Sequence, residues 1–149
     1  MTKKEYLKTG YIIKKRISIQ EAILEEYKAN LDNLKAINYS KDKLQGGPVQ
    51  DDTLIIKKLD KIFEVEKKIK KLYDELTIFQ DKVSEGIKTL NNYTEQQIIT
   101  FRYFNNYPWE KIAEKIGYSK AQTYRLHGQA LENLKISLNE IEWEFYPVL

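Results

Sequence analysis

A group of polar, basic and aromatic side chains in the last third of the chain has the chemistry to bind a nucleic acid. In a helix that begins after Ser119, these side chains share the face that points outward. Arg125 and Gln122 suit the recognition of base edges, because arginine pairs with guanine and glutamine with adenine. Ser119, Lys120 and Tyr124 can hold phosphate oxygens, helped by the amide groups at the N-terminus of the helix. The predicted DNA-binding residues are Ser119, Lys120, Ala121, Gln122, Tyr124, Arg125, Gly128 and Gln129.

Catalysis and metal binding have little chemical material in this sequence. The absence of cysteine excludes disulfides, cysteine-ligated zinc and thiol nucleophiles. The single histidine, His127, cannot build a multi-histidine metal site, and we expect a half-buried packing residue or a phosphate contact. No combination of nucleophile, base and orienting group is visible. The sequence therefore predicts no catalytic residue, no metal site and no cofactor, and the protein is not expected to be an enzyme.

The composition favours a helical protein without a membrane segment. Hydrophobic residues make up 42% and charged residues 32% of the chain, and only three prolines and six glycines interrupt the helix formers. The net charge of +3 permits a nucleic-acid partner but is small for a strongly basic domain. No apolar run approaches the roughly 20 residues of a membrane span, and no signal-peptide core follows Met1. We therefore expect an all-α, cytoplasmic protein with no membrane partner.

Two long helical patterns fill residues 1–90. In both, apolar residues recur at alternating spacings of four and three, which gives each helix one apolar seam. The first seam comprises Tyr6, Ile13, Ile17, Leu24, Tyr27, Leu31 and Leu34. The second comprises Ile55, Leu59, Ile62, Ile69, Tyr73, Leu76, Val83, Ile87 and Leu90. The pattern predicts a long antiparallel helical hairpin with coiled-coil-like packing, which closes on itself or joins another copy.

The polar residues of this region suggest how the hairpin turns and how it associates. Glycine and proline at 46–48 end the first helix, and an aspartate at 51 or 52 can cap the second. Gln20, Glu66 and Gln80 interrupt the seams and are candidates for fixing register or partner number. We expect the basic cluster near the N-terminus to be a solvated helix face. It comprises Lys3, Lys4, Lys8, Lys14, Lys15 and Arg16.

A capping signal marks the start of a second structural module. Asn91 and Asn92 break the helical pattern, and Thr94 with Gln97 forms a capping-box sequence that predicts a new helix beginning at Thr94. Three short helices are expected, at 94–104, 109–115 and 120 to about 138. A glycine at 117 suits the turn before the last helix, and a serine at 119 suits its N-cap. The predicted domains are a hairpin at 1–92 for scaffolding and oligomerisation, a helix-turn-helix at 93–138, and an acidic-aromatic tail at 139–149.

Three stretches of the second module carry a family resemblance. RYF at 102–104, WEKIAEKIGYS at 109–119 and ALENL at 130–134 resemble region 4 of bacterial sigma factors. More closely, YS at 118–119 and YRLHGQAL at 124–131 resemble small regulators of phages that infect Gram-positive bacteria, including the ArpU and RinA-like late-gene activators. The resemblance implies a transcription regulator of a phage or mobile element, with activation favoured. It also implies double-stranded DNA as a partner and the bacterial host cytoplasm as the location.

The chain departs from a complete sigma factor, and this keeps other functions open. Nothing resembles the promoter-melting region 2, and Tyr124 and Leu126 stand where sigma recognition helices are often basic. Affinity per copy should therefore be modest, and a homo-oligomer, with a dimer favoured, would offset this by joining two half-sites. One alternative is a small terminase subunit. Another is an interaction protein whose sigma-like module docks on RNA polymerase or another regulator. The tail at 139–149 either packs on the hairpin or makes a protein contact, with RNA polymerase as a candidate partner.

Overall fold

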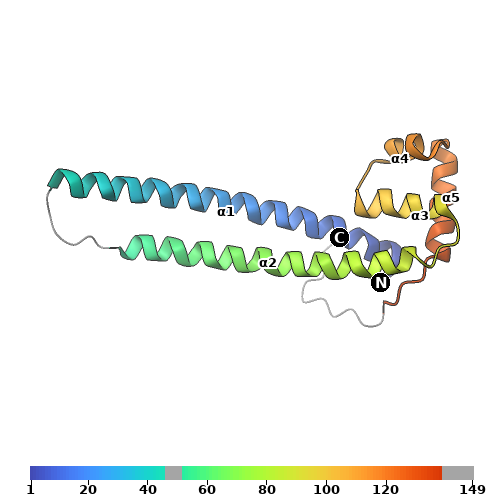
Figure 1. Cartoon of the computed structure of the whole chain (residues 1–149), viewed down its shortest axis with the longest axis horizontal. Helices are drawn as coiled ribbons and strands as arrows, with labels where there is room; N and C mark the ends of the chain where they lie inside the picture. The colour runs from blue at the N-terminus through green and yellow to red at the C-terminus, as the bar shows by residue number, and fades with distance from the viewer. Residues whose placement is uncertain (46–51, 139–149) are drawn as a thin grey trace. The chain divides into compact units, whose positions relative to one another are not determined.

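The computed structural model describes residues 1–45 and 52–138, and in this part of the chain every regular element is a helix (Figure 1). The prediction of an all-α fold is therefore confirmed. The elements are α1 (Lys3–Gln45), α2 (Thr53–Ile87), α3 (Tyr93–Ile99), the π-helical segment η1 (Thr100–Phe104), α4 (Trp109–Ile116) and α5 (Lys120–Asn133). No helix in the described ranges is both long enough and apolar enough to cross a membrane. The predicted turn at 46–48 and the predicted tail at 139–149 lie outside the described residues.

The contacts between residues group the chain into two compact units. One unit holds residues 1–14 together with the described residues from 75 onward, and the other holds residues 15–74. The boundaries predicted at 92 and 138 follow the order of the sequence and stay predictions. The grouping by contacts instead puts the first turns of α1 and the last turns of α2 with the three C-terminal helices.

In the unit of residues 15–74, α1 and α2 lie side by side and run antiparallel (Figure 1). Ile17, Leu31 and Ile62 are buried, as the seam pattern predicted. The prediction is wrong for Tyr73, whose side chain is 45% exposed because its hydroxyl reaches outward and donates to Glu21 Oε1 at 2.7 Å. The exposed salt bridge from Lys28 Nζ to Glu66 Oε1, at 3.7 Å, contributes little stability, so the apolar seam holds this unit together.

In the other unit, the start of α1 packs against the end of α2 through aromatic rings. The ring centroids of Tyr6 and Phe79 lie 5.4 Å apart, and both side chains are buried, as are Leu7 and Val83. Gly10 lies directly over the Phe79 ring, and a Cβ at this position would overlap three of its carbon atoms. In the sequence, Gly10 falls on the spacing of the first apolar seam and leaves a gap in it. The structure gives the reason, because the missing side chain makes the space that the Phe79 ring occupies.

Two lysines predicted to be solvated instead cap elements that lie far away in the sequence. Lys3 Nζ donates to the carbonyl oxygens of Leu131 at 3.1 Å and Glu132 at 3.3 Å, near the C-terminus of α5. Lys14 Nζ donates to the Phe104 carbonyl and to Asn106 Oδ1 at 2.8 Å, and its burial lowers its pKa. The carbonyl ends of helices lack partners and carry partial negative charge, so an ammonium group is stable there. The prediction of a solvated face is therefore wrong for Lys3 and Lys14.

The ends of two C-terminal helices differ from their predicted positions. Asn92, not Thr94, is the N-cap of α3, because its Oδ1 accepts from the amides of Thr94 at 2.8 Å and Glu95 at 3.2 Å. Asparagine caps helices at least as well as threonine, and α3 starts one residue earlier as a result. The last helix ends at Asn133 and not near 138, since Leu134 is extended and fully buried. Burying the Leu134 side chain therefore stabilises the chain more than another turn of helix would.

Candidate nucleic-acid interface

Helix α5 begins at a tight turn whose conformation follows from two residues. Gly117 has φ 75°, a left-handed conformation that glycine adopts without strain, and its amide donates to Ala113 O at 3.0 Å. Ser119 Oγ then accepts from the Gln122 amide at 3.2 Å and caps α5. Both roles were predicted from the sequence and are confirmed. The turn of residues 117–119 fixes where α5 starts relative to α4.

One side of α5 is buried in a small apolar core. Leu126 forms this core with Ile98 of α3 and Ile112 of α4, and Trp109 and Ile116 pack at its edge. Two further positions of the same helix, Thr123 and Ala130, are fully buried. Burial at these spacings is the pattern of a helix with one face inside. The opposite face of α5 must therefore point to solvent.

The residues predicted to bind DNA all lie on or beside this solvent-facing side. Ser119, Lys120, Ala121, Gln122, Tyr124, Arg125, Gly128 and Gln129 are each exposed. Positions 121, 122, 125, 128 and 129 follow the helical repeat, so they form one stripe along α5. The structure brings the predicted residues together on one accessible surface, which we call the α5 face.

Gly128 contributes open space to the α5 face. A Cβ built at Gly128 would meet no atom within 4 Å, so no neighbouring helix requires a glycine at this position. Close packing against another helix of the module is therefore not the reason for a glycine at this position.

Lys120 is held by an acidic partner that the sequence analysis did not identify. Its Nζ lies 2.7 Å from Oε1 of Glu110, in the first turn of α4. Hydrogen bonding between the two raises the pKa of Lys120 and lowers the pKa of Glu110. Because the pair is exposed, water screens it and it can open readily. Lys120 can therefore exchange the carboxylate for another anion.

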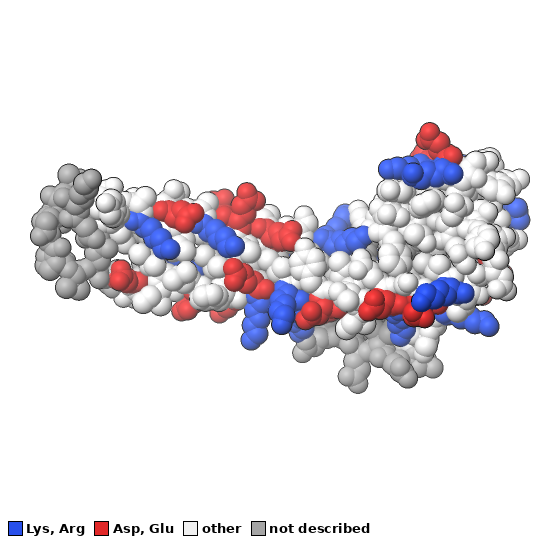
Figure 2. Space-filling view, in the orientation of Figure 1, with Lys and Arg blue, Asp and Glu red and all other residues white. Residues whose placement is uncertain are grey.

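Arg125 differs from Lys120 in this respect. Within the described ranges, no ion pair or hydrogen bond involves the Arg125 guanidinium, which projects from the α5 face. Between Trp109 and Asn133 the chain has four basic and three glutamate residues, so the local positive charge is small. On the side of the molecule drawn in Figure 2, the surface over the three C-terminal helices is mostly uncharged. Any anion binding here depends on a few cations, with Arg125 the most available.

Aromatic side chains connect the α5 face to the rest of the module. The ring of Tyr124, which is 46% exposed, meets the Trp109 ring edge-on with centroids 5.1 Å apart. The Arg102 guanidinium lies 4.5 Å from the centroid of the same Trp109 ring. Cation–π contact and ring packing therefore join both side chains to Trp109. Tyr124, which was predicted to contact phosphate, is therefore partly exposed to solvent, and its contact with Trp109 holds its ring in place.

His127 is a buried packing residue, which is one of the two roles expected for it. Its side chain is 7% exposed, its ring meets Trp109 edge-on at 4.7 Å, and Nε2 lies 2.7 Å from the Tyr103 hydroxyl. Burial lowers the pKa of His127 to about 4, and the charges of Lys4 and Arg102 add to the effect. The imidazole is therefore neutral at pH 7 and lies too deep to contact a phosphate. No group of three or more metal-ligating side chains occurs in the described ranges.

No protein-family model, curated protein or solved structure matches the chain.

Proposed function

We propose that this chain is a sequence-specific, DNA-binding transcription regulator of a phage or mobile element, and that it acts as an activator. In this proposal α4, the turn at 117–119 and α5 form a helix-turn-helix, with α5 as the recognition helix. Two helices joined by a three- or four-residue turn with a glycine are typical of that motif. The observation that carries the proposal is the α5 face, where every residue predicted to bind DNA is exposed while the other side of α5 is buried.

The proposed contacts follow from the side chains of the α5 face. An α-helix fits the major groove, and its N-terminal residues reach base edges first. Gln122 and Arg125 lie one turn apart near that end, so both would read bases. Ser119 and Lys120, at the helix start, would hold a phosphate, and Lys120 would exchange Glu110 for it. Base contacts then determine the sequence, and phosphate contacts position the helix.

The small positive charge of the module favours binding as a homodimer. Four basic residues between Trp109 and Asn133 allow few phosphate contacts per copy, and two linked copies would bind two half-sites. The unit of residues 15–74 offers a surface for self-association, because Ile56 and Phe63, seven residues apart on α2, are exposed. Light scattering should give twice the monomer mass of 17.7 kDa. A monomer at concentrations that saturate DNA would contradict this part of the proposal.

The proposal is tested by selecting duplex DNA on the purified protein and measuring variants on the selected site. Arg125→Ala should weaken binding by about 1–3 kcal/mol and relax the preference at one base position. Arg125→Lys keeps the charge but loses the two-pronged hydrogen bond, so it should relax the preference with little change in salt dependence. Lys88→Ala is the matched control, since it removes one exposed positive charge outside α5. If Arg125→Ala binds the selected site as tightly as the wild type, α5 does not read the bases.

The weak positive charge also favours one alternative, a protein that docks on RNA polymerase or another regulator. The two proposals differ in their salt dependence. Phosphate contacts make affinity fall steeply with salt, by a slope near 0.9 per contact on logarithmic axes. Absence of any salt-sensitive DNA binding, together with retention of polymerase on the immobilised protein, would favour docking. Salt-sensitive binding that Arg125→Ala reduces would favour the regulator.

A further inference from the structure

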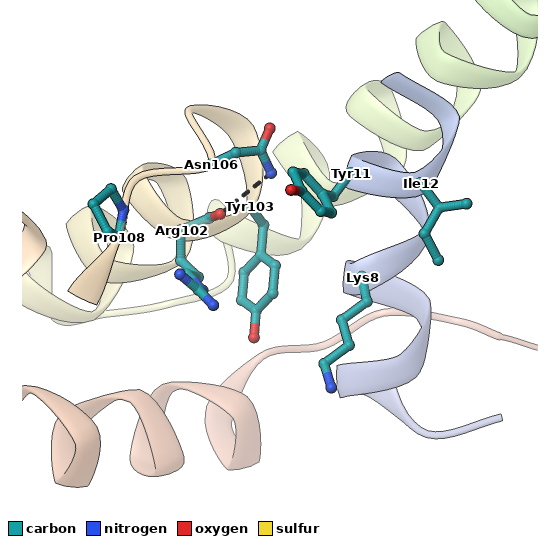
Figure 3. A pocket seen from close by; sticks show the side chains of 7 residues that line it. All are labelled: Lys8, Tyr11, Ile12, Arg102, Tyr103, Asn106 and Pro108. Atoms are coloured by element: carbon teal, nitrogen blue, oxygen red, sulfur yellow. Dashed lines mark hydrogen bonds between the residues drawn. The ribbon is translucent and has the colours of Figure 1, made fainter. Parts of the chain in front are cut away.

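A pocket of about 420 Å³ lies between the first turns of α1 and the segment that joins α3 to α4 (Figure 3). Tyr11 extends from α1 toward Tyr103 and Asn106, and the cationic ends of Lys8 and Arg102 point to the same side. All of these residues belong to the same compact unit as α5. The volume falls within the roughly 300–1,000 Å³ of small-molecule sites in proteins. None of the residues that line this pocket belongs to the α5 face, and the function proposed above assigns the pocket no role.

The chemistry of the pocket favours an anion with a flat apolar part. Lys8 and Arg102 are the charged residues of its lining, so the lining has two positive charges and no carboxylate. One Arg102 nitrogen donates to Tyr107 O at 3.0 Å, and the guanidinium stacks on Trp109, which holds it in place. The same guanidinium contributes to the lowered pKa of nearby His127, as expected for a positive local field. Tyr11 and Pro108 supply apolar wall beside these cations.

The wall that holds Arg102 and Tyr103 has an unusual backbone. Residues Thr100–Phe104 form a π-helical turn, closed by the Asn105 amide donating to Thr100 O at 3.1 Å. Asn106 then adopts φ 56°, and its side chain ties the loop by donating to Arg102 O at 3.5 Å and accepting from Lys14 at 2.8 Å. Such turns and positive-φ residues are less stable than regular helix and occur often at functional sites. Here they direct Arg102 and Tyr103 into the pocket wall.

We propose that this pocket binds a phosphate monoester attached to a flat, partly apolar group, as in a nucleoside monophosphate. Two cations match the charge of the dianion, and a guanidinium is the side chain best shaped to hydrogen-bond phosphate oxygens. The half-exposed Tyr11 ring offers a stacking surface for the flat group. Two sources could supply a phosphate to these cations: a free nucleotide, whose monoester is the ligand proposed here, and a DNA strand, whose backbone phosphate is a diester with a single charge. The proposal stands whether or not α5 binds DNA.

Binding is measured directly with adenosine 5′-monophosphate, inorganic phosphate and adenosine, by calorimetry and by ¹⁵N-detected shifts of the full chain. The monophosphate should bind more tightly than either fragment, with the largest shifts at Lys8, Tyr11 and Arg102. Lys8→Gln and Arg102→Gln should each weaken it about tenfold, the usual effect of losing a charged hydrogen bond. Lys88→Gln, an equal charge change elsewhere, should leave the affinity unchanged. Arg102 also packs on Trp109, so thermal unfolding of Arg102→Gln checks that this variant is still folded. Lys8 is exposed, so Lys8→Gln tests the loss of a positive charge without disturbing that packing.

A short duplex DNA separates the two sources. If the pocket holds a strand phosphate, Lys8→Gln and Arg102→Gln should weaken duplex binding, lower the salt slope by about 1 each, and make the monophosphate a competitor. If it holds a free nucleotide, duplex binding should stay unchanged while the monophosphate still binds. The proposal is overturned if the monophosphate binds no tighter than adenosine and Lys8→Gln has no effect on either ligand. A chain that binds the monophosphate but no DNA would refute only the regulatory function.

Discussion

Acidification from pH 7 to about pH 4 should destabilise the unit that carries α5 through one side chain, His127. The buried imidazole has a pKa of about 4, against an ordinary value of 6.5. Between these two values the unfolded chain binds a proton that the folded chain excludes. Stability contributed by the neutral imidazole is therefore complete at pH 7, falls as the pH drops through this window, and is lost below about 4. At about 1.4 kcal/mol per pKa unit, the loss is on the order of 3 kcal/mol.

This prediction can be measured without assigning any spectrum, since His127 is the only histidine in the chain. The imidazole carbon signal, followed by NMR from pH 8 downward, should not move until the protein unfolds or the pH approaches 4. Urea denaturation at several pH values should show a falling unfolding free energy below pH 6.5. Carboxylates titrate in the same range, so the wild type is compared with His127→Gln, which is neutral at every pH. An amide oxygen in the variant can still accept from the Tyr103 hydroxyl.

The difference between the two proteins isolates the histidine. Unfolding free energies of wild type and His127→Gln should diverge as the pH falls, with the wild type losing more. A histidine pKa at or above 6.5 would refute the burial that the structure gives to this ring. Parallel pH profiles would refute the linkage between that ring and stability.

Three further substitutions test the packing and the α5 face. Gly10→Ala should lower the free energy of unfolding by about 1–3 kcal/mol, measured by urea denaturation, because the new methyl group overlaps the Phe79 ring. Gly128→Ala has open space around it and should raise the free energy of unfolding by up to about 1 kcal/mol through helix propensity. Equal changes in the two variants would contradict the crowding at Gly10 and the open space at Gly128. Glu110→Gln should release Lys120, tighten DNA binding and steepen the salt slope by about 1, as measured by gel shift; an unchanged slope would mean that Lys120 does not reach a phosphate.

Local chemistry explains which parts of this fold could be predicted from the sequence. The turn before α5 follows from Gly117 and Ser119, which act within a few residues of their own positions. The direction of the α5 face follows from the spacing of Thr123, Leu126 and Ala130, whose burial leaves the other side exposed. Both features depend on residues close together in the sequence and not on how distant segments pack. They could therefore be predicted from the sequence alone.

Features that depend on distant contacts were out of reach. Lys3 and Lys14 were predicted to be solvated because the carbonyl groups that they contact lie 128 and 90 residues away in the sequence. Leu134 fits a continuing helical repeat, but the helix ends before it, and the next amide, Lys135 N, donates to Thr89 Oγ1 at 3.2 Å, two residues beyond the end of α2. Glu110 and Lys120 lie on different helices, so their pairing depends on the angle of the turn. The spacing of residues in the sequence does not predict that angle, so it does not predict the pairing.

The position of α5 depends on polar and aromatic contacts as well as on apolar burial. Its core residues Leu126 and Ala130 are aliphatic and small, and they leave the rotation of the helix loosely specified. The Tyr103–His127 hydrogen bond and the ring of Trp109 against Tyr124 have directional geometry, and they fix that rotation. Tyr103 lies in the π-helical turn and lines the nucleotide pocket proposed above. A ligand in that pocket would therefore contact Tyr103, the residue whose hydroxyl hydrogen-bonds His127 of α5.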